Sequence, residues 1–108
     1  MNKEIDPHKY LCYLAETDEQ YAQARTSVKA AEHRLKAIKA KEFLIHKGAQ
    51  AEREQVALAS HGYQLVLDEL NDVTLIAETM AAKRKTAELC IDVWRSLNSA
   101  RKQAGGNL

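Results

Sequence analysis

The chain has few of the residues that end helices or make turns. Its 108 residues include four glycines and one proline. Their scarcity, beside many Ala, Leu, Glu, Lys and Arg residues, favours long helices over a sheet. The length allows one domain at most. We therefore expect an all-α fold with a single helical domain over residues 1–104 and a disordered tail over 105–108.

Cysteines and long apolar runs are also scarce. Cys12 and Cys90 have no metal-binding or redox spacing, and we expect each to be a small, buried, unpaired side chain. Residues 1–10 lack the apolar region of a signal peptide, and no apolar run approaches the roughly 20 residues of a membrane span. These absences predict a cytoplasmic protein without a membrane partner.

Sequence signatures of catalysis are missing. The chain has no Gly-rich phosphate loop, no nucleophile elbow and no His-Glu-x-x-His motif. Its four histidines have no i, i+4 spacing that would suit a metal. We expect no enzyme activity, no catalytic residues, no bound metal and no cofactor.

Helix signals divide the chain into three segments. Asp6 followed by Pro7 is typical of a helix start, which predicts a short helix over about residues 7–16. Thr17 and Gln20 form a capping-box pattern. Long helices are then expected over about 18–47 and 50–102.

Both long helices carry a heptad pattern. Apolar residues recur at alternating steps of three and four, which indicates helix–helix packing. Glu42 interrupts the first pattern and Arg84 the second. Such residues either set the register between helices or line a functional groove, and we prefer the first interpretation. Gly62 either bends or breaks the last helix.

A short turn at Gly48 predicts a coiled-coil-like antiparallel hairpin. In that register residue i lies opposite about residue 97 − i, so that Lys29 lies near Asp68. Residues 25–47 are mostly basic and residues 48–79 mostly acidic, so the two blocks are expected to neutralise each other.

The second long helix exceeds the first in length, and it also carries a second apolar set. Both features need a further partner, which predicts a homo-oligomeric bundle. The members of the second set are Leu65, Leu75, Leu89 and Leu97.

The C-terminal part of the chain is the one basic region without an obvious acidic partner. Arg, Lys and Asn are frequent phosphate-contacting residues. Trp94 either packs in a helix interface or, if exposed, stacks on a base. The candidate nucleic-acid- or partner-binding residues are Lys83, Lys85, Trp94, Arg95, Asn98, Arg101 and Lys102.

Several segments resemble small helical proteins from the early regions of tailed bacteriophages, where recombination and replication genes are found. The similar segments are TDEQYAQA at 17–24, AERE at 51–54, Tyr63, and KRKTAELCIDVWRSLNSARK at 83–102. In such proteins a hairpin ends in a similar Trp-Arg-Ser-Leu-Asn segment. The resemblance implies a recombination accessory protein, or a modulator of a host nuclease or defence protein, in the bacterial host cytoplasm.

Three functions are compatible with these observations. The first is a non-enzymatic accessory protein that binds DNA, preferably single strands, or a recombination or replication complex, through a basic helical tip. The second is a protein–protein interaction module that inhibits or modulates a host nuclease or defence enzyme through an exposed helix face. The third is a structural or assembly protein of the virion.

Overall fold

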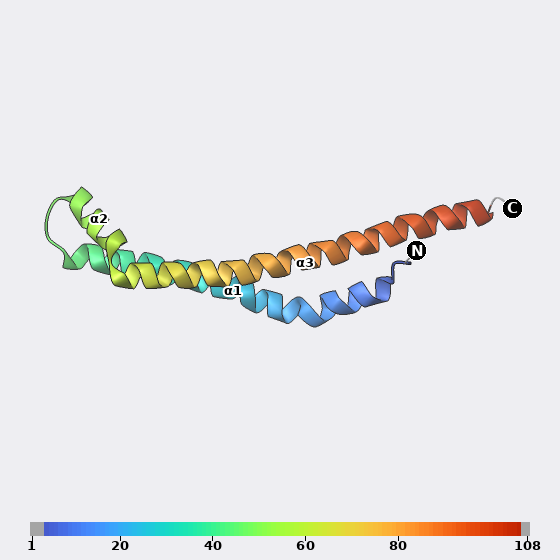
Figure 1. Ribbon diagram of the computed structural model, residues 1–108, viewed down its shortest axis with the longest axis horizontal. Coiled ribbons are helices and arrows are strands. Elements are labelled where there is room, and N and C mark those ends of the chain that lie inside the picture. Colours follow the sequence, from blue (N-terminus) through green and yellow to red (C-terminus); the bar gives the residue numbers. More distant parts are fainter. Residues whose placement is uncertain (1–3, 107–108) are drawn as a thin grey trace. The chain divides into compact units, whose positions relative to one another are not determined.

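The computed structural model describes residues 4–106, and 92% of these residues are helical. Helix α1 spans Pro7–Ile45, α2 spans Gln50–Ala59 and α3 spans His61–Gly106 (Figure 1). Residues 4–106 contain no strand, which confirms the all-α class. None of the helices in this part of the chain is long and apolar enough to cross a membrane.

The chain divides into two compact units, each of which is described by itself. The terminal unit contains residues 1–21 and 79–108, and the turn unit contains residues 22–78. Helices α1 and α3 each contribute a segment to both units, whereas α2 belongs to the turn unit alone.

In the turn unit, segments of α1 and α3 run antiparallel. Arg34 forms an ion pair with Glu69, and Ile38 lies beside Gly62, so residue numbers rise along one helix as they fall along the other. The buried side chains are small, which allows the helices to approach closely. They are Ala31, Ala57, Val66 and Ala77.

In the terminal unit, the first turns of α1 also pack antiparallel to α3. Arg84 reaches the carbonyl oxygen of Leu14, and Tyr10 is hydrogen-bonded to Cys90. Ala87 and Ile91 supply the buried apolar side chains here. The predicted antiparallel pairing of the two long helices is therefore present in the turn unit, whereas in the terminal unit the residues that pair with α3 belong to the predicted short helix.

The start of α1 follows the sequence signal, but the predicted short helix over residues 7–16 is wrong. The backbone N–H of His8 donates to Asp6 Oδ1 over 3.0 Å, as expected of a helix start. Thr17, however, is not a cap, because its hydroxyl donates to the carbonyl of Tyr13 over 2.7 Å inside a continuous helix. With no glycine or proline between residues 8 and 45, nothing ends the helix.

The predicted helix over residues 50–102, whose continuity near Gly62 was left open, is broken at Ser60 into α2 and α3. Ser60 has an extended backbone, with φ −65° and ψ 147°. Its Oγ accepts from the N–H of Tyr63 over 3.2 Å and donates to the carbonyl of Ala57 over 2.8 Å. Ser60 thus caps the start of α3. The suspected residue, Gly62, lies inside the first turn of that helix.

Two predicted ends of helices differ from the structure. Helix α1 ends at Ile45 rather than at residue 47, and α3 continues through Gly105 into the predicted tail. Residues 107 and 108 of that tail lie outside the described residues.

The predicted register is offset in the turn unit. It placed Ile38 opposite Ala59, but Ile38 lies beside Gly62, three residues further along the chain. The physical reason is that the chain does not turn tightly at Gly48. Ten residues instead form the separate helix α2 before α3 begins.

The capping role of Ser60 predicts the effect of its removal. Ser60→Ala is expected to lower the free energy of unfolding by about 1 kcal/mol, because the N–H of Tyr63 loses its acceptor. Urea denaturation followed by far-UV circular dichroism measures the change. The matched control is Ser27→Ala inside α1, where alanine has the higher helix propensity. Equal effects of the two substitutions would contradict the cap.

Candidate functional site

All seven candidate binding residues lie on α3 within the terminal unit. Trp94 and Asn98 are half-buried, and the other five are exposed. They do not form one patch, because Lys83 and Arg101 are separated by about 27 Å along the helix axis. A separation of eighteen residues makes five complete helical turns, so the two side chains leave the same face of α3.

Three of the seven share that face. Trp94 is eleven residues from Lys83, close to three turns, and so lies in line between Lys83 and Arg101. Lys85 leaves the opposite side of the helix, since two residues correspond to about 200°. Arg95 lies 3.8 Å from Asp92, and both side chains are largely exposed.

Arg84 does not belong to an open groove. Its guanidinium donates to the carbonyl of Leu14 over 2.9 Å, to Thr17 Oγ1 over 2.6 Å and to Asp18 Oδ1 over 2.5 Å. It also lies 5.1 Å from the ring centre of Tyr21, and its side chain is only 15% exposed. These contacts support the interpretation that Arg84 fixes the register of α1 on α3.

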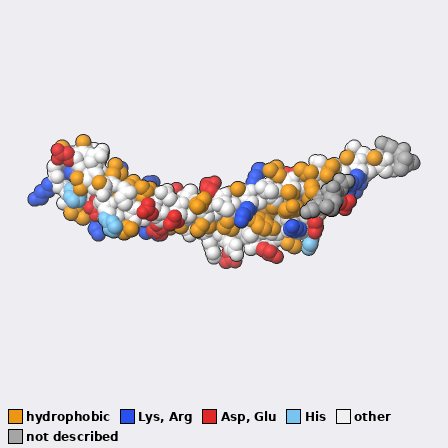
Figure 2. Space-filling view, viewed as in Figure 1, with side chains coloured by type: hydrophobic (Ala, Val, Ile, Leu, Met, Phe, Trp, Pro, Cys, Tyr) orange, Lys and Arg blue, Asp and Glu red, His pale blue; other side chains and the backbone are white. Residues whose placement is uncertain are grey.

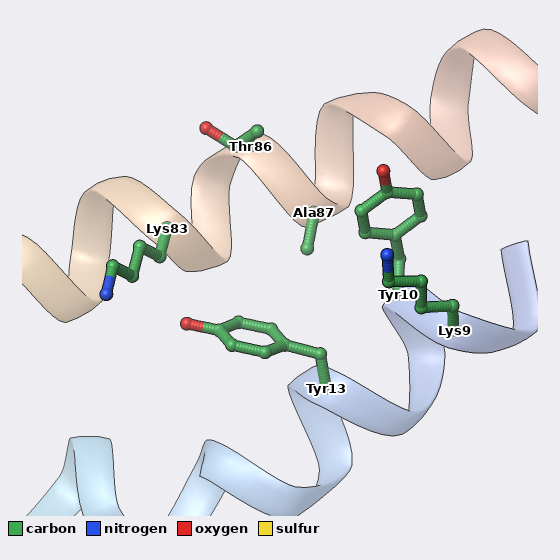
Figure 3. A pocket seen from close by; sticks show the side chains of 6 residues that line it. All are labelled: Lys9, Tyr10, Tyr13, Lys83, Thr86 and Ala87. Carbon is green, nitrogen blue, oxygen red and sulfur yellow. The ribbon is translucent and has the colours of Figure 1, made fainter. Parts of the chain in front are cut away.

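Lys83 borders a pocket of about 250 Å³ in the terminal unit, which we call the tyrosine pocket. The ring of Tyr10 extends from α1 towards α3, the ring of Tyr13 lies in the space between the two helices, and the Lys83 side chain comes from α3 (Figure 3). The Nζ of Lys9 lies 6.0 Å from the ring centre of Tyr10. The full lining is Lys9, Tyr10, Tyr13, Lys83, Thr86 and Ala87.

Helical spacing explains how these residues come together. Tyr10 and Tyr13 are three residues apart on α1, and Lys83 and Ala87 are four apart on α3, so each pair shares a helix face. Ala87 is buried and small, which leaves space between the helices beside the two rings. The pocket therefore combines two aromatic rings and two ammonium groups, and no carboxylate is among its lining residues.

The hydroxyl of Tyr10 remains protonated at neutral pH. Its hydrogen bond with Cys90, together with the charge of an ionised Cys90, raises the pKa of Tyr10 above its ordinary value. Tyr10 thus presents a neutral ring to the pocket. Both cysteines are free, and each is half-buried rather than fully buried as predicted.

The end of α3 extends past its partner helix in the terminal unit. Tyr10 lies opposite Cys90, so the antiparallel register places Pro7, the first residue of α1, near residue 93. Arg101 and Lys102 lie beyond this point and are exposed. They are therefore accessible from several sides.

A second surface lies in the turn unit. Leu44 and Ile45, at the end of α1, are 75% and 59% exposed, and Val56 of α2 is 42% exposed. Beside them, the guanidinium of Arg53 lies 4.0 Å from the ring centre of Phe43 and donates to its carbonyl over 3.0 Å. We call Leu44 and Ile45 the apolar tip.

Sequence reasoning identified Lys83 but missed Lys9, Tyr10 and Tyr13. These residues were assigned to a separate short helix, and only the pairing of α1 with α3 brings them to Lys83. Within residues 4–106, no three His, Cys, Asp or Glu side chains form a group that could hold a metal ion.

Comparison with known proteins gives no match to a family model, to a curated protein or to a solved structure. The bacteriophage resemblance therefore stays a prediction. The functional argument rests on the contacts and exposures of the described side chains.

Proposed function

We propose that the protein is a non-enzymatic binding protein for single-stranded nucleic acid and that the tyrosine pocket receives a base. The observation that carries this proposal is the lining of the pocket, where Tyr10 and Tyr13 lie with Lys9 and Lys83 and without a carboxylate. Bases stack on aromatic side chains, and lysines neutralise the phosphates beside them.

The size of the pocket agrees with a small planar group. Pockets for drug-sized ligands measure about 300–1,000 Å³. The tyrosine pocket, at about 250 Å³, fits a single base better than a larger ligand. A duplex keeps its bases stacked inside, so this mode of binding favours single strands.

The same face of α3 supplies further contacts for a strand that leaves the pocket. Trp94 is half-buried, which leaves part of its surface for stacking, and Arg101 is exposed beyond it. Both lie in line with Lys83 on α3. We therefore propose that fewer residues contact the strand than the sequence predicted, because Lys85 and Arg95 leave other sides of the helix.

The first test measures fluorescence anisotropy of labelled single- and double-stranded oligonucleotides at low and moderate salt. We expect tighter binding of single strands and weakening with salt. Tyr13→Leu removes the stacking ring and keeps an apolar side chain, and it should weaken binding about 10-fold. Lys83→Ala with Arg101→Ala should reduce the salt slope by about 1.4, or 0.7 for each lost phosphate contact.

Lys85→Ala is the matched control, because it removes the same charge from the opposite side of α3. Its dissociation constant should stay within about twofold of the wild-type value. Absence of binding at low salt would exclude the proposal. Equal losses of affinity for Lys85→Ala and Lys83→Ala would indicate non-specific electrostatic attraction rather than binding in the tyrosine pocket.

A second candidate function is supported by the apolar tip. Among the residues that the structure describes, Leu44 is the most exposed large hydrophobic side chain at 75%, and it lies beside Ile45. Exposed apolar side chains of this kind mark surfaces that bind protein partners. The protein would then modulate an enzyme such as a nuclease, as the resemblance implies. Leu44→Ser with Ile45→Ser should abolish such binding and leave nucleic-acid affinity unchanged.

A further inference from the structure

Helix α3 carries a second uncharged stripe within the terminal unit, on a side that α1 does not cover. Its members are all exposed, and Leu89, Val93 and Leu97 are 50%, 49% and 48% exposed. Many hydrophobic side chains are visible at the surface in Figure 2. The stripe, with steps of three and four, consists of Thr79, Ala82, Thr86, Leu89, Val93, Leu97, Ala100 and Ala104.

Within the terminal unit, the exposed large hydrophobic side chains of α3 are Leu89, Val93 and Leu97, and all three belong to this stripe. The buried residues among those described are four alanines with Val66 and Ile91, and none of the larger side chains is fully buried. A helix pair with so small a core gains stability from any partner that covers its exposed leucines and valines.

The order of side-chain sizes along the stripe identifies the partner. Between residues 79 and 97, three small residues precede three larger ones, and Ala100 and Ala104 lie beyond them. We propose that α3 pairs with α3 of a second copy in the antiparallel direction, about a twofold axis near residue 88, so that each pair named below lies level to within one residue. Thr86 then meets Leu89 of the second copy, Ala82 meets its Val93, and Thr79 meets its Leu97.

Each of these contacts joins one large and one small side chain, and the symmetry repeats it. Such pairs fill an interface without overlap or cavities. Parallel pairing would instead place Leu89 against Leu89 and Ala82 against Ala82. That arrangement leaves gaps at one end of the stripe, so the sequence of sizes favours the antiparallel dimer.

The charges beside the stripe agree with the same register. Lys85 lies within one residue of the level of Asp92 of the second copy, and the symmetry repeats this pair. Both side chains are exposed, and the observed neighbour of Asp92 is Arg95 at 3.8 Å. Opposite charges that flank an apolar seam select the partner and its direction.

The dimer does not depend on nucleic-acid binding, although the two surfaces touch. Thr86 belongs to both the stripe and the lining of the tyrosine pocket, whereas Lys83 and Ala87 of the pocket lie outside the stripe. The second copy would therefore lie beside the pocket.

Sedimentation equilibrium over a range of protein concentrations tests the association. We expect a dimer for the wild type, and Val93→Glu should raise the dissociation constant about 10-fold or more. Leu65→Glu is the matched control, since Leu65 is 55% exposed on α3 but lies outside the stripe. Val93 is half-exposed, so we expect the variant to fold. An unchanged far-UV circular dichroism spectrum will check this. A wild-type monomer, or equal effects of both variants, would overturn the proposal.

Cysteine cross-linking tests the direction and register in a Cys12→Ser/Cys90→Ser background. Ala82→Cys and Val93→Cys should form a disulfide only when the two variants are mixed. In the proposed dimer, identical positions lie about 16 Å apart along the axis, beyond the reach of a disulfide. Cross-linking of either variant with itself would instead indicate a parallel dimer and contradict the proposal.

Discussion

Replacing Arg84 with alanine is expected to lower the free energy of unfolding by about 3 kcal/mol. The guanidinium donates to three acceptors on α1, and its side chain is only 15% exposed. Hydrogen bonds that involve a charged group contribute about 1.5–3 kcal/mol when water is largely excluded. Urea denaturation at fixed protein concentration measures the loss.

Two control variants separate the hydrogen bonds of Arg84 from charge and packing. Arg95→Ala also removes an arginine from α3, but its 3.8 Å pair with Asp92 is exposed, so a change within about 0.5 kcal/mol is expected. Arg84→Met keeps an unbranched side chain in the seam and loses only the donors. If Arg84→Met were as stable as the wild type, packing rather than hydrogen bonding would hold α1 in register.

Local sequence patterns were sufficient for the helical class and for several details. The scarcity of glycine and proline predicted the helices, and the Asp6-Pro7 pair marked the start of α1. Arg84 was recognisable because it interrupts an otherwise apolar heptad pattern. Each of these signals is contained in a few neighbouring residues, which is why the sequence alone reveals them.

The helix boundaries depended on contacts that local patterns do not contain. Thr17 has the sequence context of a cap, yet its oxygen accepts from Arg84, which lies 67 residues away. The residue that caps α3 is Ser60, whereas the sequence pattern indicated only the nearby Gly62 as a point where the helix could bend or break. A glycine lowers the local helix propensity, but the side chain that accepts a hydrogen bond from a free N–H determines where a helix begins.

The binding surface was only partly predictable for the same reason. The candidate residues were all taken from α3, because its cations lacked acidic partners along the sequence. The tyrosine pocket needs Tyr10 and Tyr13 opposite Lys83, a contact across about 70 residues. If the predicted register is wrong by a few residues, the side chains predicted to face each other across the two helices are the wrong ones.

Gly48→Ala is expected to lower the free energy of unfolding by about 2 kcal/mol. Gly48 has a φ of 128°, a conformation that residues with a Cβ rarely adopt. An added Cβ would also lie 2.9 Å from Glu52 Oε2. The variant should therefore strain the connection between α1 and α2, and urea denaturation will measure the effect.

Two further variants distinguish backbone strain from the contact with Glu52. Gly62→Ala should be neutral or slightly stabilising, since the new Cβ would lie an ordinary 3.7 Å from Ile38 Cγ2 within a helix. In Gly48→Ala/Glu52→Ala the close contact is absent, and only the part of the loss due to that contact should be recovered. Full recovery would show that the Glu52 side chain, rather than the positive φ, makes glycine necessary at this turn.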